Sequence, residues 1–329
     1  MLVTTSYPAS PGDPSGHFVE AEARALTRRG NEVTVLCPGK PGPQDPSGPR
    51  VVRLRDSGLF GWPGAIARLR ERPSRLVGLG SFVMAAKHWL RQSRPVDAVV
   101  AHWLVPCGWP IALAAEAPLE VVAHGSDVRL LTRTPALARF VVRQLLSRAA
   151  RFRFVSAELR DELCSVVGPE LAAASRVEPA PLDLPAALSQ DAARGELSIA
   201  PHARLVLIVS RLVRGKRLGT ALSAVSLIPN AQVVVVGDGT LRAALEARFA
   251  GVRFVGRLPH DQALRWMAAA NVLVTASRRE GAPTVVREAR AMGLAVVAAP
   301  AGDLAAWARD DVGLEVIRTP ASPRGDELD

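Results

Sequence analysis

Short apolar runs of strand length alternate with amphipathic stretches of helix length along the whole chain. Apolar runs of this length are typical of strands buried on both faces of a parallel sheet. In the first half, we predict strands at 2–6, 32–37, 51–55, 98–102, 120–123 and 153–156, with helices at about 17–29, 65–70, 76–91, 108–116, 136–147 and 157–167. In the second half, we predict strands at 205–210, 232–236, 253–255, 272–275 and 295–298. The regular alternation indicates parallel α/β architecture rather than a sandwich or a helical bundle.

The chain is longer than one hydrophobic core usually supports, because it has 329 residues. The segment 176–201 has little periodicity and carries four prolines (Pro179, Pro181, Pro185 and Pro201), so it is predicted to link two domains. We place the boundary between residues 185 and 186. The prediction is therefore two Rossmann-like domains, residues 1–185 and 186–329.

The formal net charge of +10 comes almost entirely from arginine, since the chain has only three lysines. A compositional preference for arginine explains this charge, and we expect no nucleic-acid partner. The region 61–94 combines arginines with Trp62, Phe82, Met84 and Trp89. An anionic membrane surface is therefore a candidate partner, which would suit a lipid-linked substrate. The alternative is an ordinary solvated pair of helices with an arginine-rich face.

The cysteine pattern favours a reducing compartment. Cys37, Cys107 and Cys164 are scattered and have neither a disulfide framework nor a zinc-binding spacing. The chain begins directly on a predicted strand, without the features of a signal peptide. The longest apolar stretch, 96–115, is interrupted by polar residues and prolines. We expect a cytoplasmic protein, peripheral on the inner face of the membrane if the basic region binds lipid.

A polar turn joins the predicted strand 272–275 to a helix that ends near Gly293. Ligands bind at such turns in open parallel sheets. Pro283 suits the first helical position, and free N–H groups at 282–285 would favour an anionic group. Glu280 and Glu288 bracket the turn and can accept hydrogen bonds from hydroxyl groups. A sugar nucleotide has both parts. Alternatively, the two acids are a solvated loop carboxylate and a helix-dipole residue.

Two cations follow the predicted strand 205–210. Arg211 stands at the strand end, and the turn at Gly215 would bring Lys216 back near it. Two such cations suit a diphosphate. The next strand leads into a second glycine-rich turn at Gly237, for which tight turn geometry alone is an equal explanation.

Three features of the first half are candidates for ligand contact. Gly16 precedes a predicted helix, where a phosphate or sugar can approach the backbone closely, although a plain turn explains it as well. His102 and His124 close two predicted strands, and a histidine there can contact a sugar hydroxyl. Asp127 can orient His124 or cap the next helix. For His102 the alternative is an imidazole packed beside Trp103 and Trp109.

Together these motifs resemble the retaining family-4 glycosyltransferases of GT-B fold, which implies that the two Rossmann-like domains face each other across a cleft. The resemblance rests on six motifs in the family's order and spacing, which are Gly16, His124-Gly125-Ser126-Asp127, Val209-Ser210-Arg211-Leu212 with Gly215-Lys216, Val236-Gly237-Asp238-Gly239, Phe254-Val255-Gly256-Arg257-Leu258-Pro259, and Glu280-Gly281-Ala282-Pro283 with Glu288-Ala289. The family normally continues past Ala299-Pro300 into a further strand and terminal helices. Here the chain ends in the polar tail 319–329, so a shortened second domain is expected.

The resemblance implies hexosyl transfer from a nucleotide-diphospho-sugar, with retention, to a polysaccharide or lipid-linked glycan precursor. Residues 1–185 would bind the acceptor and residues 186–329 the donor. The implied catalytic residues are His124, Arg211, Lys216 and Glu280, and the implied donor contacts are Gly16, Gly237, Gly281, Ala282, Pro283, Thr284 and Glu288. His102 and Asp127 are candidates for the acceptor side. No cofactor or metal ion is expected. The alternatives are a non-catalytic sugar-nucleotide-binding protein and a sugar-nucleotide epimerase or hydrolase.

Overall fold

The computed structural model describes residues 1–317, except 11, 14, 57, 62–63 and 185–187. It divides into two compact units, Met1–Asp183 (unit 1) and Leu184–Asp329 (unit 2). The predicted boundary between residues 185 and 186, Trp62 and the polar tail 319–329 lie outside the described residues.

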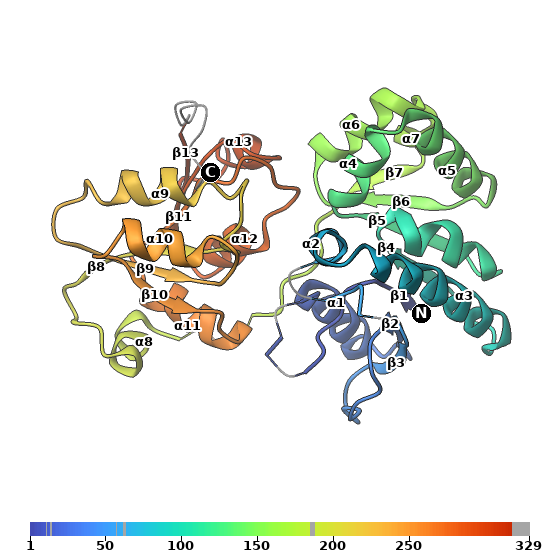
Figure 1. The fold of residues 1–329 in the computed structure, drawn as a ribbon, viewed down its shortest axis with the longest axis horizontal. Coiled ribbons are helices and arrows are strands. Elements are labelled where there is room, and N and C mark those ends of the chain that lie inside the picture. The colour runs from blue at the N-terminus through green and yellow to red at the C-terminus, as the bar shows by residue number, and fades with distance from the viewer. Residues whose placement is uncertain (11, 14, 57, 62–63, 185–187, 318–329) are drawn as a thin grey trace. The chain divides into compact units, whose positions relative to one another are not determined.

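Unit 1 is built on a parallel sheet of seven strands in the order β3-β2-β1-β4-β5-β6-β7 (Figure 1). The strands are β1 (Leu2–Val3), β2 (Thr34–Pro38), β3 (Arg50–Leu54), β4 (Val99–His102), β5 (Leu119–Ala123), β6 (Arg151–Phe154) and β7 (Ser175–Val177). The helices are α1 (His17–Arg28), α2 (Ala65–Glu71), α3 (Val77–Gln92), α4 (Ser126–Thr132), α5 (Pro135–Ser147), α6 (Ala157–Val167) and α7 (Glu170–Ala173), with a short 3₁₀ helix, η1 (Pro73–Leu76). The predicted parallel α/β pattern is confirmed.

The helix predicted at 108–116 is wrong. The chain there forms an irregular π-type segment, η2 (Leu104–Ile111), followed by a 3₁₀ turn, η3 (Ala112–Ala114). Val105 and Trp109 have extended backbones within it (φ −132° and −117°), and each precedes a proline. The residue before a proline is sterically pushed out of the helical region, and proline itself lacks the N–H that a helix needs.

The segment 176–201 is more ordered than its prolines suggested. Its first residues belong to β7, and α8 (Gln190–Leu197) follows within it. The Ser189 hydroxyl caps α8 by accepting a hydrogen bond from the N–H of Ala192 at 3.3 Å. A serine at this position satisfies one of the free N–H groups of the first helical turn. The predicted link is therefore in part secondary structure of both units.

Unit 2 contains a parallel sheet of six strands in the order β10-β9-β8-β11-β12-β13. The strands are β8 (Arg204–Val209), β9 (Ala231–Val236), β10 (Arg253–Gly256), β11 (Val272–Thr275), β12 (Ala295–Ala298) and β13 (Leu314–Val316). The helices besides α8 are α9 (Leu218–Val225), α10 (Arg242–Arg248), α11 (His260–Ala269), α12 (Thr284–Ala291) and α13 (Leu304–Trp307). Unit 2 thus has a further strand after β12, because Val296 pairs with Leu314.

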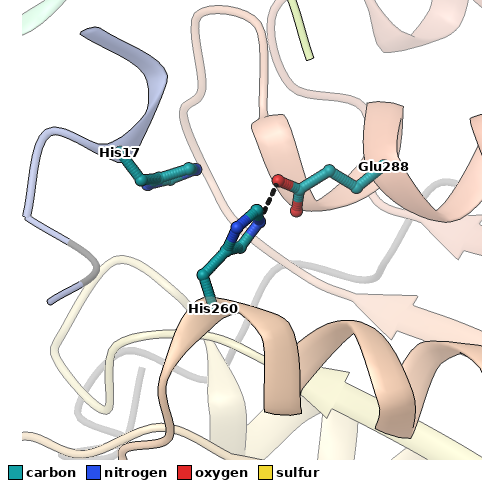
Figure 2. Close-up of side chains that lie close together, drawn as sticks. All are labelled: His17, His260 and Glu288. Atoms are coloured by element: carbon teal, nitrogen blue, oxygen red, sulfur yellow. Dashed lines mark hydrogen bonds and ion pairs between the residues drawn. The ribbon is translucent and has the colours of Figure 1, made fainter. Parts of the chain in front are cut away.

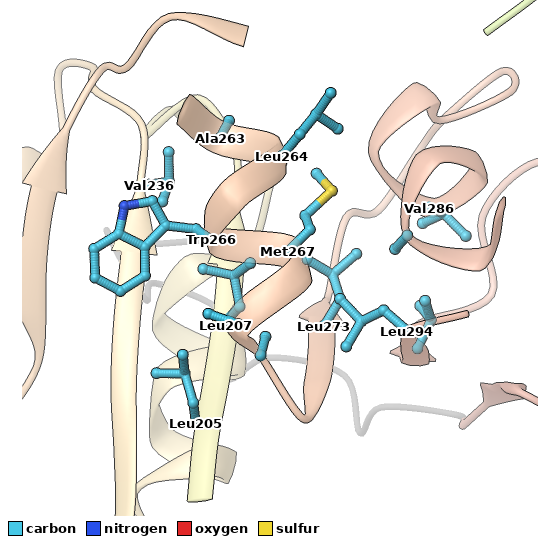
Figure 3. Close-up of a cluster of buried hydrophobic side chains, with 14 of the residues drawn as sticks. Leu205, Leu207, Val236, Ala263, Leu264, Trp266, Met267, Leu273, Val286 and Leu294 are labelled. Atoms are coloured by element: carbon cyan, nitrogen blue, oxygen red, sulfur yellow. The ribbon is translucent and has the colours of Figure 1, made fainter. Parts of the chain in front are cut away.

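Alternate residues of β8 face opposite sides of this sheet. Leu205 and Leu207 belong to a core formed with α8, α11 and α12 (Figure 3). Val206 and Ile208 belong to a second core formed with α9 and α10. Successive side chains of a strand point to opposite faces, so a strand covered by helices on both faces is apolar throughout. This explains the uninterrupted apolar run that marked the strand in the sequence.

A buried arginine ties α8 to this sheet. Arg194 is only 4% exposed. Its Nε donates to the carbonyl oxygen of Ala269 at 3.0 Å, and its Nη2 donates to the carbonyl oxygen of Ala203 at 3.1 Å and to Oδ1 of Asn271 at 2.9 Å. Its Nη1 donates to the carbonyl oxygen of Pro201. The guanidinium group therefore has an acceptor for each of its three nitrogen atoms, as a buried charge requires.

Within the described residues, no helix is both long enough and apolar enough to cross a bilayer.

Candidate functional site

The strand order of unit 2 reverses between β8 and β11. The chain passes from β8 to β9 and β10 on one side and from β11 to β12 and β13 on the other. In open α/β sheets, ligands bind beyond the carboxyl ends of the strands at such a switch point. The loops after β8 and β11 therefore form the candidate site of unit 2, and they carry Lys216 and Glu280, respectively.

An ion pair joins these two loops. Lys216 Nζ lies 2.5 Å from Glu280 Oε1, with side-chain exposures of 21% and 16%. The backbone N–H of Arg278 also donates to the carbonyl oxygen of Gly215 at 2.9 Å. The sequence predicted both charged residues as site residues but not their direct contact. The pair places a cation suited to phosphate beside a carboxylate suited to a hydroxyl group.

Arg211 begins the loop after β8 and is exposed. The hydrogen bond between the N–H of Leu212 and the carbonyl oxygen of Asp238, at 2.9 Å, holds the start of this loop against the turn after β9. The predicted clamp of Arg211 with Lys216 stays a prediction.

The turn before α12 begins its helix one residue later than predicted. Pro283 is the N-cap, with φ −64° and ψ 111°, and Thr284 is the first helical residue. The carbonyl oxygen of Pro283 accepts from the N–H of Val286 at 3.1 Å. Gly302 packs behind the turn, where a Cβ would lie 2.5 Å from the carbonyl oxygen of Gly281. This close approach supports the backbone of Gly281 and Ala282 in one conformation.

Glu288 is buried, at 5% exposure, and is held by a histidine that the sequence analysis missed. His260, the first residue of α11, has Nε2 at 2.7 Å from Glu288 Oε1 (Figure 2). His17, also drawn in Figure 2, belongs to unit 1. The sequence feature that could have identified His260 is its position. It directly follows the motif that ends at Pro259, and it begins a helix. Within unit 2, the His260 imidazole holds the Glu288 carboxylate in position.

Two glycines of the turn after β9 have a steric role within unit 2. A Cβ at Gly237 would lie 1.8 Å from the carbonyl oxygen of Ser210, and one at Gly239 would lie 2.4 Å from that of Leu212. Both residues have positive φ. Backbone packing alone therefore requires glycine here, and donor contact by Gly237 stays a prediction.

In unit 1, two histidines predicted separately are in direct contact. His102 Nδ1 lies 3.0 Å from His124 Nε2, and the rings are nearly parallel. His102 is fully buried, whereas His124 is half-buried and also packs against Phe18 and Trp103. Burial, reinforced by Arg153, lowers the pKa of His102 to about 3. Burial, with His102 and Arg153, also holds the pKa of His124 well below its usual value, so both rings are neutral near pH 7.

The candidates for the acceptor side, His102 and Asp127, are closed to a ligand in this structure. Asp127 is 3% exposed. Its Oδ1 accepts from the N–H groups of His124 (3.2 Å) and Gly125 (2.9 Å), and its Oδ2 accepts from that of Leu104 (2.8 Å). Burial raises the pKa of Asp127, and these backbone hydrogen bonds oppose that rise. Asp127 therefore fixes the backbone that carries His124 rather than the ring. His102 packs beside Trp103, one of the two tryptophans that the alternative interpretation named.

Gly16 is the N-cap of α1 and has φ +73°. A Cβ there would lie 2.3 Å from the carbonyl oxygen of Ser6. The close packing of this turn on the loop after β1 therefore requires glycine without any ligand, and a donor contact by Gly16 stays a prediction.

Comparison with known proteins identifies relatives that cover most of the chain. Residues 203–323 match the family model described as "Glycosyl transferases group 1", and residues 15–178 match "Glycosyltransferase Family 4". A 2-deoxystreptamine glucosyltransferase of Streptomyces kanamyceticus is 30% identical over 323 residues, which cover 86% of this chain and 80% of that protein. The two family models together match parts of both predicted domains.

Solved structures share the fold at low sequence identity. Sucrose-phosphate synthase from Thermosynechococcus elongatus has a TM-score of 0.74 at 20% identity, covering 97% of this chain and 86% of that chain. HepE of Anabaena, in complex with UDP and glucose, has a TM-score of 0.68 at 18% identity, covering 96% and 85%.

Proposed function

Because the chain belongs to the group 1, family-4 glycosyltransferases, we propose that this enzyme transfers a hexosyl unit from a nucleotide-diphospho-sugar, with retention of anomeric configuration. The observation that carries this proposal is the Lys216–Glu280 ion pair at the switch point of unit 2. One sugar nucleotide has both groups that the pair suits, a diphosphate for the ammonium and sugar hydroxyls for the carboxylate.

Unit 2 binds the donor in this proposal. Lys216 and Arg211 hold the diphosphate and stabilise the negative charge that develops on it as the glycosidic bond breaks. Glu280 exchanges its contact with Lys216 for hydroxyl groups of the donor sugar. The N–H groups at the start of α12 face the anionic part, and Glu288, positioned by His260, accepts from the ribose hydroxyls. The leaving phosphate helps to deprotonate the acceptor on the same face of the sugar, so no protein nucleophile is assigned.

Unit 1 binds the acceptor, and His124 contributes a polar contact from the carboxyl end of β5. The acceptor class that we propose is a polysaccharide or lipid-linked glycan precursor. For the donor, the complex of HepE with UDP and glucose and the glucosyltransferase name of the Streptomyces relative make UDP-glucose the first compound to test.

A donor screen tests this proposal. We expect one nucleotide sugar among UDP-, GDP- and ADP-linked hexoses to raise the melting temperature at millimolar concentration, because a ligand that binds only the folded state stabilises it by mass action. Product analysis with and without a glycan acceptor then separates the alternatives. Turnover without an acceptor would indicate an epimerase or hydrolase, and binding without turnover would indicate a non-catalytic sugar-nucleotide-binding protein.

The proposed transfer is independent of divalent metal ions, because Lys216 and Arg211 supply the positive charge that a metal ion would otherwise give the diphosphate. We expect the initial rate to be the same, within twofold, after dialysis against EDTA. Loss of activity that Mg²⁺ or Mn²⁺ restores would contradict this assignment.

We further infer that α3 contacts an anionic membrane surface. Val77 and Met84, one heptad apart on this helix, are 76% and 69% exposed, and the neighbouring Leu76 is 56% exposed. Arg91 is exposed on the same helix. Exposed apolar side chains beside cations are typical of helices that lie in a lipid interface. Phe82, which the sequence analysis placed in this surface, is instead fully buried.

Vesicle co-sedimentation measures this contact. We expect the enzyme to pellet with phosphatidylglycerol vesicles at low salt and to be released from them at high salt. It should not pellet with phosphatidylcholine vesicles. The double variant Val77→Ser, Met84→Ser should bind severalfold more weakly. Leu227→Ser, which changes a residue of unit 2 that is 84% exposed, serves as the matched control. Equal pelleting of all three proteins would exclude α3 as the contact.

A further inference from the structure

A buried carboxylate lies behind the histidine pair of unit 1. Glu22, on α1, is 7% exposed, and its Oε2 lies 3.9 Å from Nε2 of the fully buried His102. Both atoms are buried, and neither has a hydrogen-bond partner among the described residues. The other carboxylate oxygen, Oε1, accepts from Nη2 of the buried Arg153. Three side chains therefore follow one another in a line, Glu22, His102 and His124.

The chain of contacts permits two arrangements of protons. Each neutral imidazole carries one N–H, and one ring must donate in the hydrogen bond between His102 Nδ1 and His124 Nε2. If His102 donates, its Nε2 holds a lone pair that faces the Glu22 carboxylate, and two buried acceptors are opposed. If His124 donates, His102 Nε2 carries the proton toward the carboxylate, which is the favourable arrangement.

Arg153 is the cationic partner of Glu22. It lies on β6, is 4% exposed and also has its Nε 3.8 Å from Glu120 Oε2. A carboxylate paired with a guanidinium group accepts hydrogen bonds and donates none. The charge of Glu22 therefore selects between the two arrangements, although Glu22 itself does not touch His124.

We propose that Glu22, acting through His102, is a positioning residue that holds His124 as the tautomer with the proton on Nε2 and the lone pair on Nδ1. Nδ1 of the half-buried His124 then accepts a hydrogen bond from a hydroxyl group of the bound acceptor. The role of this hydrogen bond in transfer rests on the proposed function, whereas the tautomer does not. An acid behind a histidine sets the tautomer of catalytic imidazoles in other enzymes by the same electrostatic logic.

Nitrogen-15 NMR of the histidine-labelled full chain tests the tautomer without any turnover. We expect the Nδ1 signal of His124 to be that of an unprotonated ring nitrogen and the Nε2 signal to be that of an N–H. A spectrum in which His124 carries its proton on Nδ1 would overturn the inference, whether or not the enzyme transfers sugar. This measurement uses the wild-type protein and does not depend on how any variant folds.

Glu22→Gln should invert the tautomer. In this variant, Arg153 donates to the oxygen of the new side-chain amide, and the amide NH₂ donates to His102 Nε2. His102 then carries its proton on Nδ1 and donates to His124 Nε2. The proton of His124 therefore moves to its Nδ1. We expect kcat to fall at least tenfold with little change in the KM for the donor, by analogy with the loss that a wrong tautomer causes elsewhere. Glu22→Asp, which keeps the charge, should keep the wild-type tautomer and most of the activity.

Glu20→Gln is the matched control. Glu20 lies on the same helix and forms an ion pair with Arg24 at 3.2 Å, away from both histidines. This variant should match the wild type in tautomer and kcat. An inverted tautomer in Glu22→Gln with unchanged kcat would overturn the functional part of the inference. Failure of the wild type to transfer any tested sugar would count against the proposed function instead, while the NMR spectra would still decide the tautomer.

Discussion

Lys216→Ala is expected to lower kcat/KM for sugar transfer by about 10² to 10³-fold, the effect of removing one group that stabilises charge in a transition state. In the wild type, Nζ of Lys216 lies 2.5 Å from Glu280 at the switch point of unit 2. It is one of the two cations, with Arg211, that the proposal assigns to the leaving diphosphate. Without it, the negative charge of the leaving group develops beside the Glu280 carboxylate, which repels it. Initial rates with the identified donor measure the effect.

The fold should survive this substitution. Lys216 and Glu280 stand in the loops after β8 and β11, outside both hydrophobic cores of unit 2. Far-ultraviolet circular dichroism should therefore be unchanged. Arg214→Ala is the matched control, because it removes one positive charge from an exposed position of the same loop. Turnover of Lys216→Ala equal to that of Arg214→Ala would refute the assignment of Lys216.

Arg194→Leu is expected to destabilise unit 2 by about 3 to 5 kcal/mol, because it leaves one buried and three part-buried acceptors without their donor. The carbonyl oxygens of Pro201, Ala203 and Ala269 all accept from the Arg194 guanidinium group. For a unit of this size, the loss corresponds to a melting temperature lower by about 10 °C. Thermal unfolding followed by circular dichroism measures it.

The control for this prediction is Arg309→Leu, which makes the same change at an exposed position of unit 2. It should shift the melting temperature by about 2 °C or less, as surface substitutions usually do. If the two variants melt at the same temperature, Arg194 does not hold α8 to the sheet as the hydrogen bonds indicate.

Local sequence signals were sufficient for most elements of the fold. The strands Val272–Thr275 and Ala295–Ala298 and the helix Ala157–Val167 match their predictions residue for residue. In each of these three segments, the spacing of the apolar residues or the residues at its ends favour a single type of secondary structure. The prediction failed at 108–116, where apolar content suggested a helix but Pro106 and Pro110 exclude one, and at 190–197, where nearby prolines concealed a short capped helix.

The sequence also identified residues of the site in unit 2 but could not pair them. Lys216 and Glu280 are 64 positions apart, and their contact follows from the adjacency of β8 and β11 in the sheet. His260 was missed because a single histidine at a helix start has many ordinary explanations. The sequence contained only a weak indication for Glu22, which is a charged residue on the same buried face of α1 as Val19 and Ala23.

The sequence by itself determined the two parallel α/β domains, the family and the turns on which the candidate residues stand, because periodicity and short motifs are properties of neighbouring residues. Only the tertiary structure decided which of those residues meet. It placed Lys216 against Glu280, His260 against Glu288, and the line of Glu22, His102 and His124 within unit 1. These contacts depend on strand order and on burial, which act between residues far apart in the chain. Burial also strengthens the electrostatic effect of the Glu22 carboxylate, so that it selects the tautomer of the neutral imidazoles.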